Sequence, residues 1–215
     1  KYISHKLEPH SNVYNDLKSK HLLMDQGSSI ALDMLALKWR TKLSRLSDFT
    51  GLHMFVASLR CEHSCPYCQV SRQSEDRDLY DMSETTADAA LDLVFRSPAP
   101  AIKIEFQGGE PLLNFEIIKY VVEKAKDINV LERRNLAFVV ATNLAVIDDD
   151  MLSYFREHDV LISTSLDGPA DLHNANRPRP GKDSYERAVD GIERVRLALG
   201  RDRVSALMTT TEASL

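Results

Sequence analysis

Three cysteines lie within eight residues of this 215-residue chain, and the chain has no others. They are Cys61, Cys65 and Cys68, in the spacing C-x3-C-x2-C. An odd number of thiols this close together does not make a disulfide framework. Three thiolates on one loop can each bind one iron of a cubane and leave the fourth iron without a protein ligand, whereas cubanes built for electron transfer usually have four cysteine ligands. The spacing therefore predicts a 4Fe-4S cluster with a reaction at the open iron.

Two other interpretations of the cysteines stay open. A zinc site needs a fourth ligand, and His63 lies in the loop, but it is only two residues from both Cys61 and Cys65 and would make a cramped tetrahedron. The cysteines could also be an inert group of thiols.

Short apolar runs alternate with segments of helical period along the rest of the chain, a pattern typical of β/α units and a parallel sheet. Strands are expected at 53–58, 102–106, 136–140, 160–164 and 204–208. Helices are expected at 84–96, after Asn114, after Asp148 and from Asp183 to Gly200, with Ser83, Asn114, Asp148 and an Asp183/Glu186 capping box at their starts. The predicted fold class is α/β, with about five parallel strands of a barrel that stays open at its carboxyl end.

Polar residues follow three of these strands. The second strand runs into Phe106-Gln107-Gly108-Gly109-Glu110-Pro111, the third ends at Thr142-Asn143, and the fourth ends at 163–168, which contains Ser165 and Asp167. The carboxyl ends of strands in (β/α) barrels share one mouth, so these residues should converge with the cysteine loop. Paired glycines allow a ligand to approach the backbone, although such a pair before proline in isolation is most often only a turn.

With Tyr67 just before the last cysteine, this loop resembles the signature of the radical S-adenosylmethionine (SAM) superfamily. The resemblance implies a partial (β/α)6 barrel in which SAM chelates the open iron and is reductively cleaved to a 5′-deoxyadenosyl radical. It also implies that Tyr67 borders the adenine and that Gly108, Gly109 and Glu110 form the motif that binds the amino group of SAM. The remaining cofactor contacts that it implies are Asn143, Ser165, Asp167 and Arg187, although Arg187 fits a solvated helix arginine equally well.

The run from Ser165 to Arg177, together with 106–111, resembles the anaerobic sulfatase maturase branch with SPASM domains, and 59–72 is similar to the radical SAM maturase of the His-Xaa-Ser peptide system. This resemblance implies an enzyme that modifies a ribosomally made peptide or protein, with Gln107 contacting the substrate and a flavodoxin or ferredoxin as electron donor. The resemblance does not assign a catalytic acid or base to any residue of this chain. Cysteines for auxiliary clusters, which such maturases carry after the barrel, are missing after Cys68. The alternatives are a radical SAM enzyme acting on RNA or a small metabolite, and a non-catalytic iron–sulfur or zinc scaffold.

Charge and composition limit the classes of partner that the chain is expected to bind. The formal net charge is −5 and 43% of the residues are hydrophobic, which excludes wholesale disorder. Residues 1–50 carry eight basic and five acidic side chains (+3), and the rest carry 19 and 27 (−8). An acidic body is a poor match for phosphate backbones, so no nucleic acid partner is expected. The absence of a long apolar stretch and of a signal segment predicts a cytoplasmic protein without a membrane partner.

Two domains are expected. Residues 1–50 form an amino-terminal lead-in, which could be the end of a peptide-recognition region, and residues 51–215 form a radical SAM core. The abrupt end after the fifth strand predicts a truncated core, without its last barrel strand and auxiliary-cluster domain.

Overall fold

The computed structural model of this chain describes residues 6–23, 27, 29–70 and 72–214. The chain divides into two compact units, one ending at Phe49 and the other beginning at Thr50. The first unit holds α1 (Asn12–Ser19), α2 (Ile30–Leu43) and the 3-10 turn η1 (Ser44–Asp48). No described residue of these three elements is buried, so this unit contributes no core.

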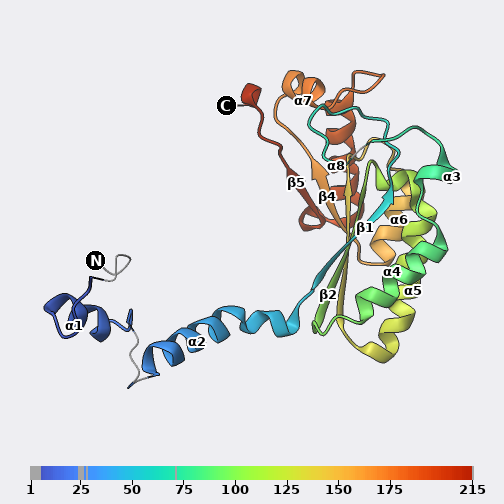
Figure 1. Cartoon of the computed structure of the whole chain (residues 1–215). Coiled ribbons are helices and arrows are strands. Elements are labelled where there is room, and N and C mark those ends of the chain that lie inside the picture. Colours follow the sequence, from blue (N-terminus) through green and yellow to red (C-terminus); the bar gives the residue numbers. More distant parts are fainter. Residues whose placement is uncertain (1–5, 24–26, 28, 71, 215) are drawn as a thin grey trace. The chain divides into compact units, whose positions relative to one another are not determined.

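The second unit is built on five parallel strands (Figure 1). The strands pair in their order along the chain and form an open sheet, which confirms the expected α/β class and the partial barrel. Their bounds are β1 (Leu52–Ser58), β2 (Ala101–Gly108), β3 (Asn135–Thr142), β4 (Leu161–Ser165) and β5 (Val204–Leu207).

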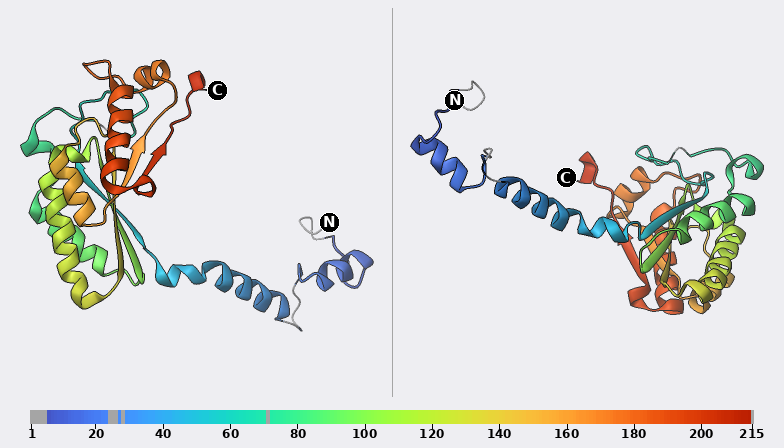
Figure 2. Two further views of the ribbon diagram at one scale, coloured as in Figure 1. Left: turned by 180° about the vertical axis from the view of Figure 1, so that it is seen from behind. Right: turned by 60° about the horizontal axis from the view of Figure 1, so that its bottom comes forward.

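Helices connect the strands, as Figures 1 and 2 show. The four long ones match the expected helices: α4 (Glu84–Phe95), α5 (Phe115–Glu132), α6 (Asp149–Glu157) and α8 (Ser184–Leu199). Short elements that the sequence did not predict add to them: α3 (Arg77–Tyr80), η2 (Pro111–Asn114), α7 (Ala170–Asn176), η3 (Arg201–Arg203) and η4 (Glu212–Ser214).

Two of the four expected helix caps form. The Ser83 and Asp148 side chains accept from the backbone N–H of Thr86 and Met151, which satisfies donors that the first helical turn leaves free. The other two predictions are wrong. Asn114 makes no capping bond, because its side chain is turned to donate from Nδ2 to the carbonyl oxygens of Ala57 and Met82. Asp183 makes none because its carboxylate pairs with two arginines.

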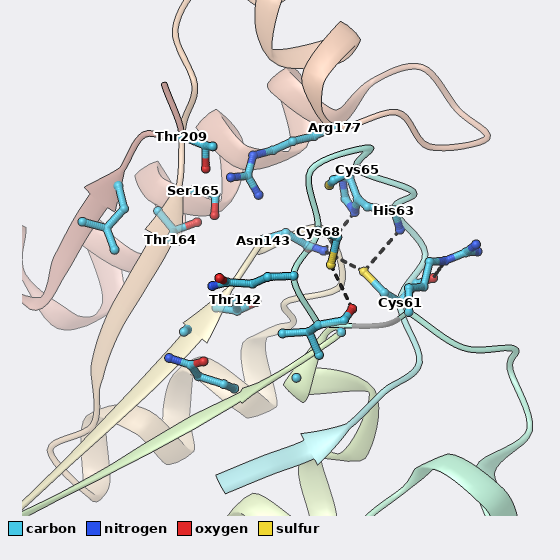
Figure 3. Close-up of a pocket in the computed structure, with 18 of the residues that line it drawn as sticks. Cys61, His63, Cys65, Cys68, Thr142, Asn143, Thr164, Ser165, Arg177 and Thr209 are labelled. Atoms are coloured by element: carbon cyan, nitrogen blue, oxygen red, sulfur yellow. Dashed lines mark hydrogen bonds between the residues drawn. The ribbon is translucent and has the colours of Figure 1, made fainter. Parts of the chain in front are cut away.

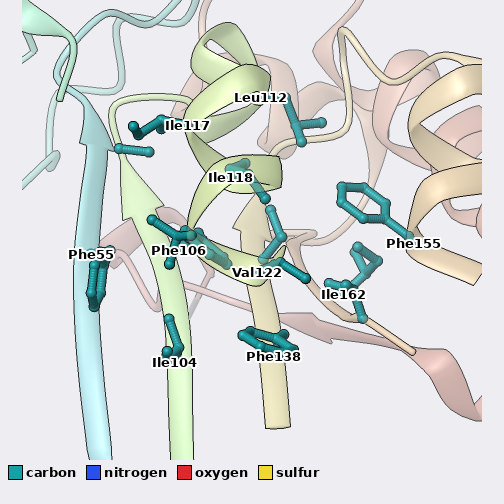
Figure 4. Packing of buried hydrophobic residues seen from close by; sticks show 14 of the residues in the cluster. Phe55, Ile104, Phe106, Leu112, Ile117, Ile118, Val122, Phe138, Phe155 and Ile162 are labelled. Carbon is teal, nitrogen blue, oxygen red and sulfur yellow. The ribbon is translucent and has the colours of Figure 1, made fainter. Parts of the chain in front are cut away.

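The core lies between the sheet and these helices (Figure 4). Alternation along β1 sends Phe55 and Ala57 into this layer, where they are 3% and 0% exposed. Leu52, Met54 and Val56 lie on the opposite face of the strand and are 45%, 60% and 40% exposed. The helices thus cover one face of β1 and leave the other accessible.

Candidate active site

A cavity of about 380 Å³ opens at the carboxyl ends of the strands. Nine of the twelve predicted site residues line it: Cys61, Cys65, Tyr67, Cys68, Gln107, Gly108, Gly109, Asn143 and Ser165. Figure 3 shows the cysteine loop facing the ends of β3 and β4 across this space. The parallel topology explains the convergence, since these residues lie at or just after the carboxyl ends of four neighbouring strands, β1 to β4.

The paired glycines allow the end of β2 to pack closely against the backbone at the end of β1 and just after it. A Cβ on Gly108 would lie 2.1 Å from the carbonyl oxygen of Ser58, and one on Gly109 would lie 2.3 Å from that of Arg60. The N–H of Gly109 donates to Ser58 and that of Glu110 to Arg60. The sequence suggested that the missing side chains make room for a ligand. In the structure they make room for the start of the cysteine loop, and both glycines still line the cavity.

Glu110 does not line the cavity. Its side chain is buried and accepts from the hydroxyl of Thr142 at 2.6 Å, from the N–H of Asn143 at 2.8 Å and from that of Leu112 at 3.0 Å. Burial, reinforced by the nearby charge of Glu62, raises the pKa of Glu110 to about 8. The geometry makes this carboxyl a link between the ends of β2 and β3.

Asp167 is also fully buried behind the cavity wall. It accepts from the Tyr67 hydroxyl, from the Arg177 guanidinium at 2.8 and 3.2 Å and from the N–H of Thr209 at 3.0 Å. Burial opposes its charge, but the bonds from Arg177 and Tyr67 outweigh burial and hold the pKa of Asp167 below its usual value. Asp167 thereby joins the cysteine loop, β4 and the segment after β5.

The structure corrects the expected position of Arg187. Its side chain is half exposed, donates to Asp183 and is not among the lining residues. Arg177 lines the cavity instead, next to the Tyr67 ring. No sequence pattern singled out Arg177, because its place depends on helix α7, which was not predicted.

The thiols of Cys61 and Cys65 are neutral in the metal-free chain. Burial, followed by the charge of Glu62, raises the pKa of Cys61 to about 12, and burial raises the pKa of Cys65. A metal ion binds thiolate and displaces the proton, so occupation of this site would be coupled to proton release. Ligand atoms of Cys61, Glu62 and His63 lie within 4.8 Å of one another, but Nδ1 of His63 already accepts from Nδ2 of Asn143 at 2.9 Å.

The residues present fit an iron–sulfur cluster with a polar organic ligand beside it. Three soft sulfur donors lie on one loop at the cavity, which suits iron–sulfur chemistry. Across from them, Thr164 is one of the residues that line the cavity, and its buried hydroxyl has no hydrogen-bond partner among the described residues. Buried polar groups are rarely left unpaired, so this hydroxyl points to a ligand atom.

Sequence reasoning did not assign several lining residues to the site, namely Thr142, Thr164, Arg177 and Thr209, and it considered His63 only as a zinc ligand. The two threonines at 142 and 164 carried a signal, since both stand at the ends of expected strands. Thr209 carried none, because only its place after β5 brings it to the cavity.

The sequence profile of the Radical SAM superfamily matches residues 55–211. The chain belongs to the radical SAM superfamily. A 4Fe-4S cluster and SAM are the cofactors of this superfamily, and they are therefore the cofactors of this chain.

The chain is similar in sequence to several known proteins. An uncharacterized protein of Methanocaldococcus jannaschii is 32% identical over 134 residues, which are 62% of this chain and 44% of that protein. The radical SAM cyclopropyl synthase TigE of Paramaledivibacter caminithermalis is 23% identical over 64% of this chain and 31% of its own length. A serine-type anaerobic sulfatase-maturating enzyme of Bacteroides thetaiotaomicron is 26% identical over 64% of this chain and 33% of its own length. The chain thus spans less than half of each.

The fold is similar to that of native anSMEcpe with bound AdoMet and Cp18Cys peptide, with a TM-score of 0.60 and 23% identity over 74% of this chain and 42% of that one. AdoMet is another name for SAM. In the part of the chain that the structure describes, no helix combines the length and hydropathy needed to cross a membrane.

Proposed function

We propose that this chain is the core of a radical SAM maturase that modifies a side chain in a ribosomally made peptide or protein. The observation that carries the proposal is the shared cavity, where three cysteines, a buried unpaired hydroxyl and the Gln107 side chain meet at the strand ends. Kinship with the sulfatase-maturating enzymes and likeness to a peptide-bound fold favour a peptide over a small metabolite.

Gln107 is the residue proposed to contact the substrate. Its Nε2 donates to Oε1 of Glu105 at 2.6 Å, two residues earlier on the same face of β2. A carboxylate only accepts hydrogen bonds, so the amide group of Gln107 must turn its NH₂ to Glu105 and its oxygen away. That oxygen is then available to accept a hydrogen bond from a peptide N–H or a side-chain donor.

The other residues would hold and orient the cofactors. Cys61, Cys65 and Cys68 would bind three irons, Asn143 and Ser165 would contact SAM, Tyr67 would border its adenine, and Arg177 would face the same space. When bound, the cluster supplies the electron that cleaves SAM and so permits hydrogen abstraction from the substrate. The protein's contribution is to position these groups and to exclude water from them.

The test is anaerobic reconstitution with iron and sulfide, followed by electron paramagnetic resonance of the dithionite-reduced protein with and without SAM. We expect a reduced-cluster signal that shifts on adding SAM, disappears in Cys65→Ala and is accompanied by 5′-deoxyadenosine. The conservative control is Ser71→Ala, a hydroxyl near the loop in sequence that belongs to no predicted site.

Two results would reject the proposal in different ways. Zinc in place of iron, or a cluster that does not respond to SAM, would favour the scaffold alternative. Modification of an RNA or a small metabolite, with none of a peptide, would keep the radical chemistry and reject the substrate class. An electron donor such as a flavodoxin or ferredoxin remains part of this proposal.

A further inference from the structure

Arg60, the residue before the first cysteine, is held through its guanidinium group and through both of its backbone polar groups. Its guanidinium donates from Nε and Nη2 to the two oxygens of Asp81, each at 2.7 Å, and from Nη2 to the carbonyl oxygen of Leu113 at 2.6 Å. Its backbone N–H donates to the Ser58 hydroxyl at 3.0 Å, and its carbonyl accepts from the N–H of Glu110 at 2.7 Å.

A separate hydrogen bond holds Cys61 from its other side. Nε of Arg72 donates to the carbonyl oxygen of Cys61 at 2.8 Å. Cys61 is therefore fixed through both flanking peptide groups. Cys68 differs, because it is exposed and its thiol donates to the carbonyl oxygen of Val70, close by on the same loop.

Asp81 brings a distant segment to this point. It lies 20 residues after Cys61, just past α3, and forms an isolated bridge with Ser58 at the end of β1. The Ser58 hydroxyl also donates to its carboxylate at 2.6 Å. The side chains of Arg60 and Asp81 are only 10% and 11% exposed, so the pair is shielded from solvent.

Buried ion pairs are a poor source of stability, since the loss of hydration offsets most of the attraction. They do fix geometry, and a two-pronged arginine–carboxylate pair fixes it in direction as well as distance. Ligand groups held in place beforehand lose less conformational entropy when they bind. These facts favour a role in positioning over a role in stability alone.

We propose that the Arg60–Asp81 pair positions Cys61 as the pre-formed ligand of the cluster and slows the loss of iron from it. Arg60 and Asp81 are then positioning residues, because neither side chain touches the cluster-binding thiols in any contact that the structure records. The inference depends on the cluster alone and holds whatever the substrate is.

The experiment uses the reconstituted chain, with a ferrous-iron chelator as the probe. Asp81→Asn removes the charge and one of the two acceptor oxygens while keeping the shape. We expect iron to be released about 10-fold faster than from the wild type, the lower end of what partners of metal ligands contribute. The signal of the reduced cluster should also broaden, because Cys61 would adopt more than one position.

Two controls separate positioning from stability. Val195→Ala shortens a fully buried side chain in α8, on an element that carries no predicted ligand, and so destabilises the fold without touching the loop. Asp88→Asn makes the matching change in the surface pair with Lys124. Both variants should release iron at the wild-type rate under conditions where all the proteins are folded.

Arg60→Lys is the second test variant, because it keeps the charge and loses the two-pronged geometry. It should also release iron faster, and the double variant should be no faster than the worse single one, since the two residues act as a unit. If Asp81→Asn and Arg60→Lys lose iron no faster than Val195→Ala, the positioning role is refuted while the proposed function stands. A wild-type chain that takes up no iron would refute both.

Discussion

Individual residues around the cavity divide into those that face it and those that hold its wall together. Cys61, Asn143 and Ser165 face it, whereas Glu110 and Asp167 stand behind and have their oxygens taken by protein donors. Sequence motifs do not separate these two kinds of residue. Glu110, for example, directly follows the two cavity-lining glycines in the sequence, but its buried carboxylate binds the protein at the end of β3.

Gly109 gives the sharpest test of this division. Gly109→Ala would put a Cβ 2.3 Å from a backbone oxygen that cannot move without displacing the cysteine loop. We expect a loss of about 1–3 kcal/mol in the free energy of unfolding, as for overpacked sites. Urea unfolding measures it. Gly51→Ala is the control, because its nearest contact would be 3.2 Å and the cost should be smaller; equal costs would contradict the packing argument.

Asp167 should make stability depend on pH. Its pKa is lower in the folded chain than its ordinary value, so its contribution is present above the unfolded pKa and is lost as pH falls through the folded one. Asp167→Asn should cost about 3 kcal/mol near neutral pH, because Arg177 keeps a charge without its partner.

The measurement is urea unfolding of wild type and Asp167→Asn at a series of pH values. The difference between the two should be constant down to about pH 5 and shrink below the usual pKa of an aspartate. A difference that grows as pH falls would show that the carboxyl is protonated in the folded chain.

The residue types and spacing at the cavity were predictable from the sequence. The contacts that hold these residues from behind the cavity wall were not. Cysteine spacing and strand-end polarity are local features, so the chain order shows them. Arg177 and Arg187 are ten residues apart on either side of a turn, and which one reaches the cavity depends on α7 and on the ion pairs of Asp183.

At the level of elements, strong periodicity located the strands, the starts of the long helices and the ends of α4 and α8 within one or two residues. Helix α7 was missed because its seven residues are too short to repeat an apolar face, and two of them, His173 and Asn176, are buried polar side chains. Two caps were wrong for a related reason, since other partners compete for cap-forming side chains: distant carbonyl oxygens for Asn114, and arginines four residues away on either side for Asp183.

Helix α6 offers a direct measure of what a cap contributes. Asp148→Ala removes the bond to the N–H of Met151 and should destabilise the fold by about 1 kcal/mol. Asp150→Ala removes the same charge from the same turn without removing that bond. The difference between the two variants in thermal or urea unfolding isolates the cap, and variants of equal stability would show that only the charge matters.

For the molecule as a whole, the two faces of the sheet have different roles. Helices bury one face, where Phe55, Ile104 and Val140 are nearly inaccessible, and the strand ends carry the chemistry. The other face of β1 exposes large apolar side chains. Because side chains alternate along β1, a residue buried in the core is followed by one that is exposed on the opposite face.

Met54 and Phe55 are neighbours on β1 that are 60% and 3% exposed. Phe55→Ser should cost about 3–5 kcal/mol, as large-to-small changes in a core do. Met54→Ser should change the free energy of unfolding by about 0.5 kcal/mol or less, because little of the side chain leaves a packed environment. It should also reduce concentration-dependent light scattering, since exposed apolar strands promote association. A destabilisation by Met54→Ser as large as that by Phe55→Ser would mean that the exposed face is covered in solution, and this face of the sheet would then belong to the core.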